Sequence, residues 1–62
     1  MTTLVSKKQV REMITLSFAQ IDRLEAAGRF PKRIRVSNNR VAWIRDEVST
    51  WIDARIADAR TP

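Results

Sequence analysis

Apolar residues first recur with helical spacing near the start of the chain, and the pattern predicts a short helix over about Lys7 to Ile14. Ser6 opens the sequence Ser-Lys-Lys-Gln, a capping box in which the serine oxygen accepts from a free amide while Gln9 reaches back. Before it, Leu4 and Val5 are expected to add a brief strand or to pack under the helix. The stripe expected to face the core consists of Val10, Met13 and Ile14.

The same arrangement recurs eleven residues later. Thr15 and Leu16 make the turn, and Ser17 begins a second capping box, Ser-Phe-Ala-Gln. Two capped helices in succession are typical of a helix-turn-helix. Gly28 is expected to supply the left-handed residue that ends the second helix, and Pro31 prevents a restart nearby. The apolar side of this helix is expected to comprise Phe18, Ile21 and Leu24.

The outward side of the second helix carries candidate recognition residues. On a helical wheel, Ala19, Arg23 and Ala26 point away from the apolar side. In a helix-turn-helix that side faces the major groove, where glutamine suits adenine, arginine suits guanine and alanine touches a thymine methyl group. Two alternatives stay open: Gln20 also belongs to the capping box, and Arg23 either pairs with Glu25 or stays solvated. The predicted base contacts are Ser17, Ala19, Gln20 and Arg23.

From Lys32 to Trp43 the period changes to two, which predicts a β-hairpin. The bend reads Ser-Asn-Asn, and asparagine tolerates positive φ, which suits a tight turn. One face is expected to be basic and outward, so that the hairpin acts as a wing along phosphates or in the minor groove. The other face is expected to hold Ile34, Val36, Val41 and Trp43. The predicted DNA contacts of the wing are Arg33, Arg35, Asn38, Asn39 and Arg40.

A third helix is expected to begin after Asp46 as its cap, with Glu47 in the first turn. Its apolar stripe consists of Val48, Trp51, Ile52 and Ile56, and residues 57–62 are expected to fray. Trp43 and Trp51 are expected to close a small core. The predicted fold is mostly α with a small β-hairpin, a winged helix-turn-helix of three helices plus a wing. Residues 1–62 are expected to form this single domain, with an ordered core of about 4–57.

The net charge of +5 is unevenly distributed. Residues 1–45 carry ten Lys or Arg against three acids, a balance of +7, whereas residues 46–62 carry two against four, a balance of −2. A localised basic patch attracts polyanions, and counterion release favours DNA. The alternative is that this basic face is only solvated and keeps the protein soluble. The position of the charges on the predicted wing favours a role in DNA binding. The candidate phosphate contacts among the lysines are Lys7, Lys8 and Lys32. For Lys7 and Lys8 the alternative is that they are only solvated.

The composition also excludes classes of function. The chain has no cysteine, histidine or tyrosine, which removes disulfides, the common zinc sites and the usual activating base. With one glycine it has no glycine-rich phosphate loop. We therefore expect no enzyme, no catalytic residue, no metal and no cofactor. The chain shows no bilayer-spanning run or signal peptide, so we expect a cytoplasmic protein without membrane partners.

With these residues assigned, the chain resembles the AlpA-type prophage regulatory proteins, in a winged-helix group that also contains excisionases and MerR-type DNA-binding heads. The resemblance covers roughly Leu4 to Arg55. In place of the polar and aromatic residues common in related sequences, this chain has Phe18 and Asp22, so a target sequence is not carried over. The matching segments are Thr15 to Ser17, Ile21 to Leu24, Gly28 to Lys32, Val41 to Trp43, and Asp46 to Val48 leading to Trp51.

The resemblance implies a phage-associated protein that binds double-stranded DNA. It would regulate transcription, promote excision as a recombination directionality factor, or do both, with Arg23 and the wing as DNA contacts. A phage integrase or RNA polymerase is the implied protein partner, and several copies on adjacent sites would self-associate on DNA. The alternative is a small protein-interaction module, antitoxin-like or anti-repressor, that uses the basic wing or the acidic third helix. Double-stranded RNA is disfavoured because its major groove is too deep and narrow.

Overall fold

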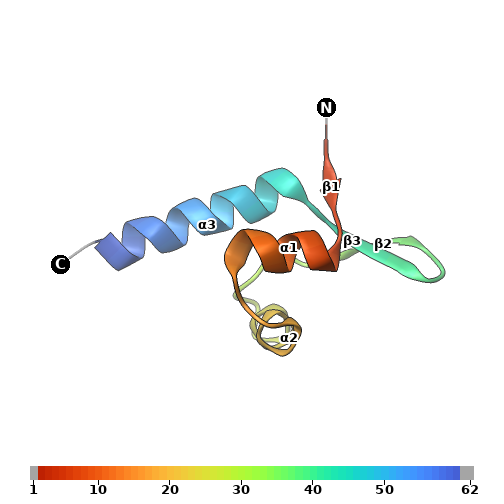
Figure 1. Ribbon diagram of the computed structural model, residues 1–62, viewed down its shortest axis with the longest axis horizontal. Helices are drawn as coiled ribbons and strands as arrows, with labels where there is room; N and C mark the ends of the chain where they lie inside the picture. Colours follow the sequence, from red (N-terminus) through yellow and green to blue (C-terminus); the bar gives the residue numbers. More distant parts are fainter. Residues whose placement is uncertain (1, 61–62) are drawn as a thin grey trace.

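The computed structural model describes residues 2–60. Over this range the chain forms three helices and three strands, which confirms the predicted mostly α fold with a small wing. The elements are β1 (Leu4–Val5), α1 (Lys7–Ile14), α2 (Phe18–Ala26), β2 (Ile34–Ser37), β3 (Arg40–Ile44) and α3 (Arg45–Arg60). The β2–β3 hairpin and α3 project in opposite directions, and α1 and α2 lie together on one side of them (Figure 1).

Both predicted capping boxes are present, and they fix where α1 and α2 begin. In α1 the Ser6 amide donates to Gln9 Oε1 at 2.8 Å, and the Gln9 amide donates to Ser6 Oγ at 3.2 Å. In α2 the Ser17 amide donates to Gln20 Oε1 at 3.0 Å, and the Gln20 amide donates to Ser17 Oγ at 3.2 Å. These bonds satisfy amides at the helix start that have no partner within the helix. The turn between the helices passes through Thr15, whose φ of 60° is left-handed.

The exit from α2 also follows the prediction. Gly28 has a φ of 74°, in the left-handed region that suits glycine, and its amide donates to the Glu25 carbonyl at 3.1 Å. The chain then turns through Phe30 and Pro31 to β2. Phe30 is only 5% exposed, and its ring meets both tryptophan rings edge-on. Phe30 therefore anchors this connection in the core.

The sheet has the order β1-β3-β2, with β3 in the centre and antiparallel to both neighbours. Val5 in β1 pairs with Trp43, so the brief strand expected at Leu4 and Val5 is confirmed. The register of the hairpin differs from the prediction. Arg35 lies opposite Val41 and Ser37 opposite Arg40, which leaves Val36 as an extra residue in a β-bulge.

The bulge reverses the predicted faces of β2. In an unbroken hairpin with a two-residue turn, Val36 would pair with Val41 and would share a face with Trp43. In the observed register Arg35 lies opposite Val41 instead, and Ile34 pairs with Ala42. A slip of one residue moves every side chain of a strand to the other face. Consequently Arg33 and Arg35 lie on the Trp43 face, and the Arg33 guanidinium sits 5.0 Å from the centre of a Trp43 ring. The prediction of one shared apolar face was therefore wrong.

The tip of the hairpin uses a different conformation from the expected one. Among residues 2–60 the positive φ values belong to Thr15 and Gly28, so Asn38 and Asn39 do not adopt the left-handed conformation. Tight hairpins with negative φ at both turn residues do not match the twist of their strands. The bulge at Val36 is where this hairpin departs from regular pairing.

The third helix begins one residue before the expected cap, because α3 starts at Arg45 directly after β3. Asp46 and Glu47 lie in its first turn, where carboxylates favour the helix dipole. The Arg45 amide donates to the Thr3 carbonyl at 2.8 Å, which links the start of α3 to the first strand. Residues 57–60 are helical rather than frayed, and residues 61–62 lie outside the described part of the chain.

The core lies where the helices meet the centre of the sheet. It is built around Trp43, and both tryptophans have the core role that was predicted. The Trp43 indole donates to the Pro31 carbonyl at 2.9 Å, and the half-buried Trp51 indole donates to the Arg29 carbonyl at 2.7 Å. Phe18 was expected in this core but is 40% exposed. The buried core residues are Val5, Val10, Ile21, Phe30, Trp43 and Val48.

Candidate nucleic-acid interface

Arg23, the predicted recognition residue on the outward side of α2, is exposed. Ile21 is fully buried and faces the core, so Ala19 and Arg23 on the opposite side are exposed. In the described part of the chain no carboxylate lies within ion-pair distance of Arg23, and Glu25, its suggested partner, is bound by Arg33 instead. The Arg23 side chain is thus available for an external partner.

The two polar residues at the start of α2 are exposed but engaged in the capping box. Ser17 Oγ accepts from the Gln20 amide, and Gln20 Oε1 accepts from the Ser17 amide and hydroxyl. The Gln20 side chain therefore has its oxygen committed to the helix start and only its NH₂ group left to donate. A base contact from this residue would have to use that amino group or break the capping box.

Asp22 is the centre of a network that joins three elements. Its carboxylate lies 3.0 Å from Lys7 Nζ in α1 and 2.7 Å from Arg33 Nη2 at the base of β2. Glu25, one turn later, lies 2.7 Å from the same Arg33 nitrogen and also accepts from Arg33 Nε and the Arg33 backbone amide. The planar guanidinium reaches Glu25 through Nε and Nη2 and Asp22 through Nη2, a planar geometry that a lysine ammonium does not offer. The network links α2 to α1 and to the base of the wing.

The network changes the ionisation of its members. Hydrogen bonds from Arg33 and then Lys7 lower the pKa of Asp22 below its ordinary value. Burial raises the pKa of Glu25, but its bonds with Arg33 outweigh this and leave that pKa lowered. Bonds to the two carboxylates raise the pKa of Arg33. Asp22, Glu25 and Arg33 are therefore charged at neutral pH. Two of the predicted DNA-contacting cations, Lys7 and Arg33, already have protein partners.

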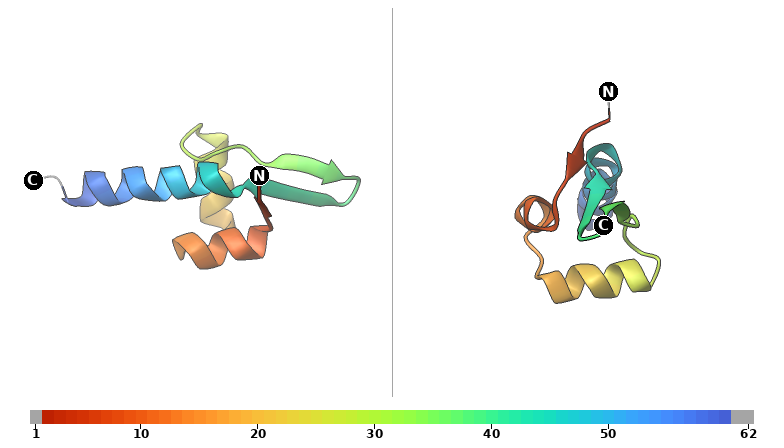
Figure 2. Two further views of the ribbon diagram at one scale, coloured as in Figure 1. Left: turned by 90° about the horizontal axis from the view of Figure 1, so that it is seen from above. Right: turned by 90° about the vertical axis from the view of Figure 1, so that its right-hand side faces the viewer.

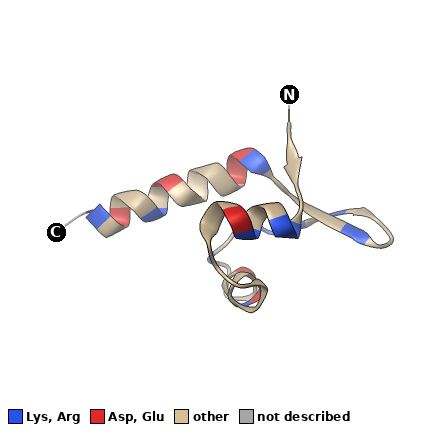
Figure 3. Cartoon of the chain, in the orientation of Figure 1, with Lys and Arg blue, Asp and Glu red and all other residues tan. Residues whose placement is uncertain are grey.

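The remaining wing residues are exposed and have no ion pair within residues 2–60. The register pairs Arg35 with Val41 and so places it on the Trp43 face of the hairpin. Figure 3 shows basic positions at the start of α1 and on the wing, and mixed charges along α3. The exposed wing residues are Arg35, Asn38, Asn39 and Arg40, and the exposed lysines elsewhere are Lys8 and Lys32.

Two views place these elements relative to one another. The axis of α2 runs across the direction of the wing and α3, and the wing extends to one side of it (Figure 2). Arg33 closes the corner between α2 and the wing through Asp22 and Glu25. The candidate interface is defined here as the exposed side of α2, this corner, and the Arg35 side of the wing. It brings the predicted recognition helix and wing together on one side of the molecule.

Two features of the interface were missed by sequence reasoning. The first is the bridge from Lys7 and Arg33 to Asp22, whose partners are 15 and 11 residues away in the chain. The available signal was the presence of two acidic residues, Asp22 and Glu25, on a helix predicted to face DNA, because a carboxylate there needs a basic partner. The second is Phe18, whose ring lies 5.1 Å from Lys7 Nζ and 5.3 Å from the Arg11 guanidinium. The helical spacing alone assigned this ring to the core.

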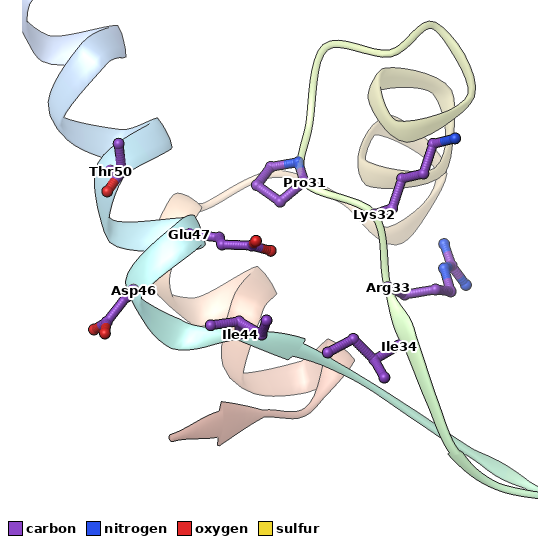
Figure 4. Close-up of a pocket in the computed structure, with 8 residues that line it drawn as sticks. All are labelled: Pro31, Lys32, Arg33, Ile34, Ile44, Asp46, Glu47 and Thr50. Carbon is purple, nitrogen blue, oxygen red and sulfur yellow. The ribbon is translucent and has the colours of Figure 1, made fainter. Parts of the chain in front are cut away.

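The opposite face of the hairpin has a different character. An open cleft of about 740 Å³ lies between the base of β2 and the start of α3, with Ile34, Ile44 and Pro31 on its walls and Glu47 directed toward it (Figure 4).

Residues 2–60 contain no cluster of His, Cys, Asp or Glu side chains that could hold a metal ion. Across the same residues no helix has the length and apolar character needed to cross a bilayer.

These features define a small winged helix-like domain. Residues 3–56 match the family described as Prophage CP4-57 regulatory protein (AlpA), and the chain belongs to this family of phage regulatory DNA-binding proteins. The family is a regulatory one and is not known for enzymes. The match covers every element of the fold except the end of α3. No curated protein matches the chain.

Proposed function

We propose that this protein binds specific sites on double-stranded DNA, with α2 in the major groove and the wing along the flanking backbone. The observation that carries the proposal is the Asp22–Arg33–Glu25 bridge, because it connects α2 to the base of the basic wing. A helix and a wing joined at one corner suit a duplex, whose grooves and phosphates have a regular spacing.

The proposed contacts divide by role. Arg23 and Ala19 face base edges in the major groove, with Ser17 and the amino group of Gln20 at the start of the helix. Arg35, Arg40, Asn38 and Asn39 contact phosphates or the minor groove. Lys8 and Lys32 add phosphate contacts, while Lys7 and Arg33 act chiefly by positioning α2 and the wing.

Salt dependence of binding to a random duplex tests the wing. Each phosphate contact contributes about 0.9 to the slope of log affinity against log salt. Arg35→Ala should reduce the slope by about this amount. Arg60→Ala is the matched control, because it removes the same charge from the far end of α3 and should leave the slope unchanged. Equal slopes for the wild type and Arg35→Ala would remove the wing from the interface.

Amide NMR titration with a short duplex at low salt maps the whole interface. Shifts clustered at residues 17–27 and 33–40 that fade as salt rises would support binding through both elements. Shifts confined to residues 46–58, or no shifts, would contradict it. They would favour the second candidate function, a protein-interaction module, which rests on the cleft where Glu47 lies beside Ile34 and Ile44.

We further propose that the DNA-bound protein acts as a prophage excision factor, a transcriptional regulator, or both. A domain of 62 residues covers few base pairs, so selective binding at an attachment site requires several copies on repeated sequences. Such copies would self-associate on DNA and bend it for a phage integrase. At a promoter one or two copies would act on RNA polymerase. Stoichiometry and bending on a selected natural site separate these roles: an array with a bend supports excision, and one or two copies without a bend support regulation.

A further inference from the structure

Phe18 is an apolar residue placed in solvent at the start of the candidate recognition helix. It is the first residue of α2 and is 40% exposed. The other aromatic side chains of the chain lie in or against the core, with Phe30 at 5% and Trp43 at 0% exposed. Leaving apolar surface in water forgoes about 25 cal/mol for each Å² that burial would gain. Five other apolar side chains are exposed to a similar degree, from Ile34 at 37% to Val36 at 52%, so Phe18 is distinguished by its place at the start of the candidate recognition helix rather than by the size of its exposure.

Two cations border the ring and keep it at the surface. Lys7 Nζ and the Arg11 guanidinium lie 5.1 and 5.3 Å from the ring centre. At these distances both cations are attracted to the π-system. They come from α1, whereas a residue in the core would be surrounded by apolar groups. The ring is thus bordered by groups that suit phosphates, and it leaves an uncovered part for an apolar ligand.

The position of the ring on α2 points to the ligand. Phe18 lies on the same flank of the helix as Asp22, which is bonded to Lys7 and to Arg33 at the base of the wing. The next residue, Ala19, is on the exposed side of the helix. Residues at the start of a recognition helix contact base edges in the major groove, and the apolar group displayed there is the C5 methyl of thymine.

We propose that Phe18 is a specificity-determining residue that packs against the C5 methyl group of a thymine. This inference rests on the proposed function, because it requires α2 to occupy the major groove. The C5 methyl is displayed in the major groove, and the nearby Lys7 and Arg11 cations would be available to the neighbouring phosphates. Ring and methyl bury each other's apolar surface, and thymine is favoured over cytosine at that position of the site.

The test replaces thymine by uracil, which removes only the methyl group. A binding site is first selected from a pool of random duplexes with the complete protein, and each thymine of that site is then replaced singly by deoxyuridine. One replacement should weaken binding of the wild type about four-fold, the effect of one buried methyl group. In Phe18→Ala the same replacement should have no effect. Phe18→Leu, which keeps an apolar side chain, should retain part of the discrimination.

The outcomes separate this inference from the proposed function. If no thymine-to-uracil change matters, or if Phe18→Ala retains the full effect, the methyl contact does not belong to Phe18 and the inference is overturned, although specific binding stands. If no site can be selected and Arg35→Ala leaves the salt slope unchanged, the proposed function fails as well. Thermal unfolding of Phe18→Ala checks folding, and a loss of structure would itself contradict the surface role assigned to this ring.

Discussion

The Asp22 carboxylate lies 2.7 Å from Nη2 of Arg33, and this contact ties the second helix to the base of the wing. Glu25 holds the same guanidinium from one turn further along α2. The relative orientation of the two elements is therefore set by a charged corner on the surface as well as by the apolar core.

Replacing Arg33 by lysine should weaken this corner although the charge is kept. A lysine ammonium lacks the two guanidinium nitrogens that reach Glu25 together while one of them also reaches Asp22, so we expect Arg33→Lys to lower the free energy of unfolding. Arg35→Lys, two residues further along in β2, is the control, because Arg35 has no carboxylate partner among residues 2–60. Urea denaturation measures both variants. Equal stabilities would show that the fork contributes nothing.

The lowered pKa values of Asp22 and Glu25 predict acid sensitivity. A carboxyl with a lower pKa in the folded protein than in the unfolded chain binds fewer protons when folded, so it stabilises the fold at high pH. Its contribution is complete above the ordinary values of 3.8 and 4.5, and it is lost as the pH falls through the lowered folded values. Thermal unfolding from pH 6 down to about pH 2 should show this loss.

The double variant Asp22→Asn, Glu25→Gln provides the comparison for the acid effect. It should be less stable than the wild type at neutral pH and should lose less stability on acidification, because the groups that titrate have been removed. Glu12→Gln, at an exposed position in α1 with no ion pair in the described part of the chain, is the control. A double variant as acid-sensitive as this control would show that the acid response arises elsewhere.

The hairpin register shows where sequence patterns stop being informative. Alternation in β2 and β3 correctly located both strands, but alternation within a strand does not say which face pairs with which across the turn. A single bulged residue, Val36, turned Ile34 away from Trp43 and brought Arg33 over its ring. The bulge depends on the backbone conformation of the tip, which two asparagines do not specify.

The helix ends were predictable because their signals are local. Each capping box needs four residues, and Gly28 supplies its φ alone. Asp22 and Phe18 were less predictable because their environments are made by α1 and β2, which are distant in the sequence. The helical wheel assigned both Phe18 and Ile21 to the apolar side of α2. The assignment is correct for Ile21, which lies deeper in the helix and is buried. At the first turn the core has already ended, so the ring reaches the surface.

Arg23→Ala should act on specificity. Its side chain is exposed and unpaired in the described part of the chain, so the fold should be unaffected. We expect a loss of about 1 to 3 kcal/mol at a selected site and a smaller gap between specific and random DNA. Competition binding with both duplexes measures the gap. If both affinities stayed the same, α2 would not be the recognition helix.

Gly28→Ala isolates the cost of a left-handed backbone. A Cβ at this position would meet no atom within 4 Å, so the φ of 74° is the obstacle rather than a clash. The variant should lose about 1 kcal/mol of unfolding free energy. Gly28→Asn should lose less, since asparagine tolerates this conformation better. An alanine variant as stable as the wild type would mean that α2 ends without using the left-handed turn.

No connecting loop separates β3 from α3, so the wing continues directly into the long helix. β3 ends at Ile44 and α3 begins at Arg45, and the helix of 16 residues is about 24 Å long. Val48 and Trp51 hold the first half of this helix against the core. The direction in which the second half of α3 extends from the body is therefore set at the same junction that sets the direction of the wing.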